Sequence, residues 1–212
     1  METGRHWRWP AFFPESVAPT LARGVWQLDP QASTVSFAVP FWWGLATVKG
    51  RFRHYAGHFE LGARPAIELT IDAASVDTGN ARRDRHLRSE EFFAVGRDPY
   101  IRFVSRTVRL DDDRLFVVGD LSARGSHIEV ELDATVTEVD DAYELEAETF
   151  VMHSGLGMTW NPGQITRPWS RLSVAGRLVQ VPVAPGALRS AAPGRRPARS
   201  CRGARPVKES RP

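Results

Sequence analysis

The sequence predicts an all-β protein of about eight antiparallel strands. Apolar and polar residues alternate with a period of two along most of residues 25–181, which is the spacing of strands with one buried face. Short joins rich in Gly, Asp, Asn and Pro separate these runs, as in hairpins. Helical periodicity is almost absent. These observations favour an up-and-down barrel or a sandwich, and periodicity alone leaves both open.

The first half of the chain contains three of the expected strands. They lie at 25–39, 46–60 and 67–73. The turn residues Asp29 and Pro30 break the first strand in two. Pro40 and three consecutive aromatic residues at 41–43 separate it from the second. Three successive side chains cannot share one face of a strand, so at least one of these aromatics is expected at a loop or a barrel mouth.

The second half contains the remaining strands. They are expected at 100–110, 115–122, 126–136, 143–151 and 170–180. The clearest alternation begins at Ser126, where Val130 and Leu132 occupy one face and Glu129 and Glu131 the other. This pattern indicates a strand with a fully polar outer face.

Residues 75–93 interrupt the alternation. The segment opens with the turn signal Asp77-Thr78-Gly79-Asn80, is dense in arginine and carboxylate, and ends on the adjacent rings of Phe92 and Phe93. It predicts a polar connection with a short helical turn near residues 78–95. Two adjacent phenylalanines at the end of a charged loop need apolar surroundings, which suggests a lid over a core or a cavity.

A long, irregular set of residues extends this pattern through the chain. Its members are Asp77-Thr78-Gly79-Asn80, Arg83-Asp84, His86-Leu87, Ser89, Phe92-Phe93, Pro99-Tyr100-Ile101-Arg102-Phe103-Val104-Ser105, Val118-Gly119-Asp120-Leu121, Gly125, Trp26, Leu28-Asp29, Ser33, Val35, Phe37, Val48, Gly50 and Phe52. The set resembles the signature of the YceI-like family, and the resemblance spans residues 26–180. It implies a lipocalin-like antiparallel β-barrel that holds a long polyisoprenoid chain in its apolar interior, and so favours the barrel over the sandwich.

A barrel of about eight strands is just wide enough to be filled by its own side chains or to hold one slender ligand. Small residues on the apolar face indicate a hollow interior, although a solid core stays open on the residues alone. They are Ala46, Gly50, Ala73, Gly119, Ala134 and Ala147. Ten larger apolar residues are predicted to line the cavity. They are Phe37, Val39, Val48, Phe52, Leu69, Ile71, Phe92, Phe93, Ile101 and Phe103.

The arginines of the central segment have two interpretations. Arg82, Arg85 and Arg88 are predicted contacts for an anionic head group, such as the pyrophosphate of a prenyl lipid. Arg83 and Asp84 are instead expected to staple the loop, with Asp84 holding an arginine and Arg83 reaching a carboxylate at a strand end. The resemblance implies that the ligand itself is a polyisoprenoid or an isoprenoid quinone.

The chain divides by composition into an irregular arm at 1–24, the barrel at 25–181 and a basic tail at 182–212 that is predicted to be disordered. Residues 186–212 carry a net charge of +7, which leaves −4 on residues 1–185 of a chain whose total is +3. The aromatic arm and the basic tail are compatible with a peripheral membrane contact, and the sequence is also compatible with a homodimer. No specific nucleic-acid partner is expected. Since the first residues lack the apolar core of a secretory signal, a cytoplasmic protein is expected, although many family members are periplasmic.

Catalytic and metal chemistry are not expected. His54 and His58 are separated by about 13 Å on a strand, which is too far to share one ion. The single cysteine, Cys201, lies in the tail, and no nucleophile elbow, phosphate loop or dinucleotide fingerprint is present. The sequence therefore predicts a non-enzymatic protein without catalytic residues, metal or cofactor, and the resemblance implies that it stores or transports an isoprenoid lipid. Two alternatives remain. One is a stress-response or interaction module in which the barrel is filled and the basic tail binds the partner. The other is an enzyme that acts on a small apolar substrate in the cavity, with His86 as acid or base.

Overall fold

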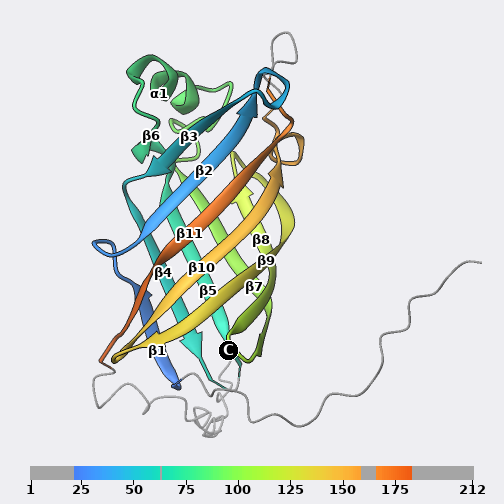
Figure 1. Cartoon of the computed structure of the whole chain (residues 1–212). Coiled ribbons are helices and arrows are strands. Elements are labelled where there is room, and N and C mark those ends of the chain that lie inside the picture. Colours follow the sequence, from blue (N-terminus) through green and yellow to red (C-terminus); the bar gives the residue numbers. More distant parts are fainter. Residues whose placement is uncertain (1–21, 63, 159–165, 183–212) are drawn as a thin grey trace, which may run out of the picture. The chain divides into compact units, whose positions relative to one another are not determined.

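The computed structural model describes residues 22–62, 64–158 and 166–182 (Figure 1). Nearly all of the predicted arm and of the predicted tail lies outside these residues. The strands are β1 Gly24–Leu28, β2 Thr34–Phe41, β3 Ala46–Phe52, β4 Tyr55–Leu61, β5 Ala66–Asp72, β6 Val76–Asp77, β7 Tyr100–Asp111, β8 Arg114–Ala123, β9 Ser126–Val139, β10 Ala142–Met152 and β11 Trp169–Gln180. One α-helix, α1 Ala81–Arg88, and three 3-10 turns, η1 Trp42–Gly44, η2 Ala73–Ser75 and η3 His153–Leu156, complete the described part.

The strands form one closed antiparallel barrel. β11 pairs with β10 from Trp169 to Leu178 and divides its other edge between β2 and β1. Trp26 of β1 lies opposite Gln180, and Phe37 of β2 lies opposite Leu172. Because β1 and β2 form one broken strand, and β3 and β4 another, the closed ring has eight members. The predicted fold class is therefore confirmed.

Side-chain alternation around this ring separates an apolar interior from a charged surface. On β10, Tyr143, Leu145 and Val151 are buried, whereas Glu144 and Glu146 between them are exposed. The other long strands show the same parity. A closed sheet with this alternation buries one face of every strand in a common interior, which is where the apolar residues gather.

One end of the barrel is closed by large side chains. Trp26 and Tyr143 meet there with ring centroids 4.7 Å apart in an edge-to-face arrangement. Leu28, Leu61 and Leu178 are also buried at this end. α1 lies at the opposite end (Figure 1), and its residues Arg82 and His86 line the mouth of the interior there.

The connection between β5 and β7 carries α1, the only α-helix in the described ranges. Asn80 starts the helix, because its Oδ1 accepts from the backbone N–H groups of Arg82 and Arg83, each at 3.1 Å. The helix and the turns that follow occupy the 78–95 segment where a helical insertion was predicted. They cover the end of the barrel without closing it.

Candidate functional site

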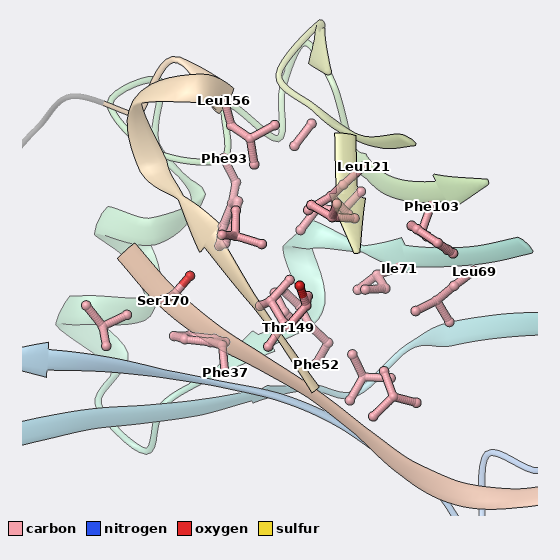
Figure 2. A pocket seen from close by; sticks show the side chains of 18 of the residues that line it. Phe37, Phe52, Leu69, Ile71, Phe93, Phe103, Leu121, Thr149, Leu156 and Ser170 are labelled. Atoms are coloured by element: carbon pink, nitrogen blue, oxygen red, sulfur yellow. The ribbon is translucent and has the colours of Figure 1, made fainter. Parts of the chain in front are cut away.

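The barrel encloses a cavity of about 760 Å³. Figure 2 shows Phe37, Phe52, Ile71, Phe103 and Leu121 around it. Almost all of its wall is aliphatic or aromatic. An interior of this size lies in the range of cavities that hold small organic ligands, so the barrel is hollow.

The structure places all ten of the predicted apolar residues on the cavity wall. Eight of them come from β2, β3, β5 and β7, and Phe92 and Phe93 come from the turns after α1. Phe93 packs edge-to-face on Phe52, with centroids 5.8 Å apart, which joins the covering segment to the wall of the barrel. Their contact with a ligand stays a prediction.

The small residues were expected to leave room inside the barrel, but most of them do not line the cavity. A side chain at Gly50 would collide with the ring of Phe37, and one at Gly119 would lie 2.6 Å from Phe103. These two glycines are therefore covered by aromatic rings from the neighbouring strands. Of the six predicted small residues, only Ala134 and Ala147 line the cavity. They face each other across the ladder between β9 and β10.

Polar groups concentrate at the open end. Asn80, Arg82, Arg83 and His86 of the α1 segment line the cavity there, and His153 lines it from η3. Burial lowers the pKa of the His153 imidazole below its ordinary value, because the charged form loses hydration. The result is an apolar tube with a polar mouth, which suits a molecule with one polar end.

Thr78 anchors α1 to the barrel. Its backbone N–H and its hydroxyl both donate to Oδ1 of the buried Asp84, at 2.9 and 2.5 Å. Arg83 donates from Nε to the Thr78 hydroxyl oxygen and from Nη2 to the Thr78 carbonyl, at 2.8 and 3.0 Å. Arg83 and Asp84 thus hold the loop as predicted, but the expected partners, an arginine and a strand-end carboxylate, were wrong, because both side chains bind Thr78.

The three predicted head-group arginines have different surroundings. Arg82 is exposed and lines the mouth. Arg85 is exposed and does not belong to the lining. Arg88 donates from Nε to the carbonyl of Ala74 and from Nη2 to that of Val76, both at 2.7 Å, and so fixes the helix to the turn before it. Of the three, only Arg82 lines the cavity, and its contact with a head group stays a prediction.

Arg124, in the turn between β8 and β9, fixes both sides of the mouth. Its Nη1 donates to the carbonyl of Gly157 at 2.5 Å, and its Nη2 donates to that of Glu90 at 2.9 Å. These bonds tie the segment after α1 to the segment after η3. Asn80 and His86 belong to the segment that the sequence singled out, whereas His153 carried no sequence signal. His153 reaches the mouth because η3 converges on the distant α1 segment.

The wall of the barrel opens between β9 and β10 near the mouth. Their ladder ends at Asp133 and Glu148, although both strands continue. Beyond that point the Thr149 hydroxyl donates to the carbonyl of Glu131 at 2.7 Å. A second hollow of about 410 Å³ lies on the outside here, and Val130 and Thr149 line both hollows.

Within residues 22–62, 64–158 and 166–182, no group of three or more His, Cys, Asp or Glu side chains could hold a metal ion. None of the helices found there is long and apolar enough to cross a membrane. The predicted cytoplasmic location depends on residues 1–21, which lie outside the described part, and it stays a prediction.

A closed eight-stranded barrel, hollow and apolar inside and open at one end, defines a lipocalin-like protein. Within that class the chain belongs to the YceI-like family, because the model of the YceI-like domain matches residues 26–183. The recognition made from the sequence is confirmed.

Curated relatives match over part of their length. Protein YceI of Escherichia coli O157:H7 is 37% identical over 95 residues, which cover 43% of this chain and 50% of that protein. Protein YceI of Salmonella arizonae is 35% identical over the same shares. The chain thus spans about half the length of the curated relatives it matches.

Solved structures share the fold at low sequence identity. BcnA of Burkholderia cenocepacia has a TM-score of 0.66 at 17% identity, over 72% of this chain and 99% of that one. A polyisoprenoid binding domain from Saccharophagus degradans has a TM-score of 0.61 at 14% identity, over 74% and 98%. The Campylobacter jejuni YceI protein has a TM-score of 0.55 at 22% identity, over 63% and 85%.

Proposed function

We propose that this chain binds one long apolar molecule of the polyisoprenoid class inside its barrel, for storage or transport. The observation that carries the proposal is the apolar cavity of about 760 Å³, closed at the Trp26–Tyr143 end and open beside α1. Membership of the YceI-like family, and a neighbour in fold described as a polyisoprenoid binding domain, support this ligand class.

The volume of the cavity suggests how much of the ligand is enclosed. At about 30 Å³ per heavy atom, the share of one water molecule in the liquid, the cavity has room for about 25 heavy atoms. That corresponds to about five isoprene units. Because the far end is plugged, a longer chain would leave its remaining units at the mouth.

The mouth supports a polar or anionic head group. Arg82 is exposed at the mouth, and Asn80 and His86 line the same end of the cavity. A guanidinium group binds phosphate oxygens well and also donates to a quinone carbonyl. The head group would therefore lie at the mouth beside α1, with the chain directed toward Trp26 and Tyr143.

Shielding from water supplies the binding energy. Burying one isoprene unit of five carbons contributes roughly 4 kcal/mol at about 0.8 kcal/mol per carbon, before the costs of ordering the ligand. A lipid already in a bilayer gains little from this term, because its chain is out of water in both places. Uptake from a membrane therefore depends on the fit of the chain and on the contacts at the mouth.

Organic extraction of the purified full-length chain, followed by mass spectrometry, tests the proposal. We expect a prenyl lipid to be recovered in a fixed ratio to protein, and the emptied protein to take up an added prenyl alcohol. Protein that comes out without lipid and also fails to take up the alcohol would contradict the proposal.

A further inference from the structure

Large apolar side chains lie exposed on the outside of the barrel around its mouth. The exposed fractions are 55% for Trp42, 87% for Leu45, 62% for Phe150 and 50% for Met152. Trp169 packs edge-to-face on Phe150, with ring centroids 5.3 Å apart. These five residues, the apolar rim, come from η1 and the turn after it, from the end of β10 and from the start of β11.

The register of the strands brings the parts of the rim to the same end of the barrel. Met152 is the cross-strand partner of Trp169, and the backbone N–H of Arg167 donates to the carbonyl of Pro40 at 2.9 Å. The ends of β10, β11 and β2 therefore lie side by side at the end of the barrel that carries α1 (Figure 1). Exposed apolar groups that gather in one place in this way mark a contact surface.

The rim is also continuous with the cavity. Phe41 lines the cavity and stacks on Trp42, with centroids 5.5 Å apart and planes inclined by 25°. On β10, Val151 lines the cavity between Phe150 and Met152, which face outward. Trp42 has a φ of 48°, which a bulky residue rarely adopts, so the backbone accepts strain where the tryptophan is presented. Apolar surface thus runs from the interior over the edge of the mouth to the outside.

Charge indicates what the rim meets. The sequence has no carboxylate from 30 to 59 or from 149 to 182, and these stretches supply the rim together with Lys49, Arg167 and Arg171. Further from the mouth the outer face of β10 becomes acidic, with exposed Glu144, Glu146 and Glu148. The basic side chains lie on the β3 and β11 side of the rim, whereas exposed Glu129 and Glu131 of β9 share the outer hollow with Phe150 and Met152. An anionic lipid bilayer fits the apolar and basic side, because the acidic flank along β9 and β10 stays in water.

We propose that the apolar rim docks the mouth of the barrel on an anionic lipid bilayer. Aromatic rings suit the interface between head groups and acyl chains, and the rim would bring the opening of the cavity to that depth. This docking proposal rests on the proposed function only for the identity of the molecule that passes through the mouth. The docking itself needs no ligand in the cavity, so the two can fail separately.

Flotation of the full-length chain with vesicles tests the docking. The vesicles are equal parts phosphatidylcholine and phosphatidylglycerol, free of isoprenoids, at physiological ionic strength, where a Debye length of about 8 Å weakens binding through distant charges. The first variant combines Trp42→Asn, which suits the positive φ, with Leu45→Ser, and the second combines Phe150→Ser with Met152→Ser. Each is expected to weaken vesicle binding about tenfold or more, as the loss of two buried apolar side chains implies.

The matched control combines Val104→Ser with Val179→Ser, which removes exposed apolar side chains outside the rim. It is expected to bind vesicles like the original chain, and circular dichroism checks that all variants are folded. Rim variants that still bind, or a control that weakens equally, would overturn the proposal. A dimer in sedimentation velocity that the rim variants abolish would also overturn it, because a second copy would then occupy this face. Vesicle binding by a chain that yields no isoprenoid on extraction and takes up no added prenyl alcohol would uphold docking and reject the proposed function.

Discussion

Filling the cavity at Ala147 should shorten the ligand that the barrel accepts. Ala147 lies opposite Ala134 across the ladder between β9 and β10, and both line the cavity. The Ala147→Phe substitution places a phenyl ring where two small side chains now face each other. Neighbouring Glu146 is exposed on the outer face of the same strand, so Glu146→Phe adds the same ring without reaching the interior.

The size of the effect follows from the volume of the ring. Six added carbons, at about 30 Å³ each, take about 180 Å³, or roughly a quarter of the cavity volume of about 760 Å³. A ligand that fills the original cavity then keeps about six fewer carbons out of water, which costs up to about 5 kcal/mol at about 0.8 kcal/mol per carbon. Since a displaced end can emerge at the mouth, we expect a loss in affinity of at least about 100-fold for a prenyl alcohol of about 25 carbons. One of about 15 carbons should lose less than about threefold.

Displacement of a fluorescent fatty acid by the two alcohols measures both affinities, and thermal unfolding shows whether each variant is folded. Equal weakening of the short and the long alcohol by Ala147→Phe would refute the reasoning from volume. Selective weakening of the long alcohol in Glu146→Phe would show that the inward and outward faces of β10 are assigned wrongly.

Three predictions concern stability. Gly119→Ala should lower the free energy of unfolding, measured in urea, by about 1–3 kcal/mol, because its Cβ would lie 2.5 Å from the carbonyl oxygen of Val104. Gly62→Ala is the control, because Gly62 has open space around it. Equal losses of stability in the two variants would contradict the crowding at Gly119. Hydrogen bonds from Arg53 and from the backbone N–H of Gly79 lower the pKa of Asp77 from 3.8 to about 2, so its stabilising effect is complete above about pH 4 and is lost as the pH falls toward about 2. Asp77→Asn should flatten that part of the plot of unfolding temperature against pH, and an unchanged slope would reject the assignment. Burial lowers the pKa of His153 below 6.5, so acidification below about pH 6.5 should weaken the fold, and His153→Gln should remove this loss; a variant that responds to acid as the original chain does would rule His153 out.

Strand parity could be predicted from the sequence because it is local. The alternation along 67–73 and 100–110 is enough to place Leu69, Ile71, Ile101 and Phe103 on one face, and the structure has all four on the cavity wall. The aromatic run at 41–43 was expected at a loop or mouth, and Trp42 lies there in η1. No long-range information was needed for these positions.

The remaining features depend on contacts between distant residues. Gly50 and Gly119 looked like empty space, but the rings that cover them come from neighbouring strands. Thr78 could not be identified as the partner of Arg83 and Asp84, because that contact needs the turn at 77–80 to fold back on α1. The rim likewise joins residues from 42 to 169, which become neighbours only when β11 is in place.

The position of β11 has a consequence for folding. This strand pairs with β1, β2 and β10, so the first and last parts of the sheet meet only after the ribosome has synthesised everything between them. Contacts so far apart in sequence slow folding, because a long loop must be ordered before they form. Until β11 docks, β1, β2 and β10 each expose an unpaired edge. The nascent chain is then open to intermolecular strand pairing and aggregation, from which the finished ring is protected.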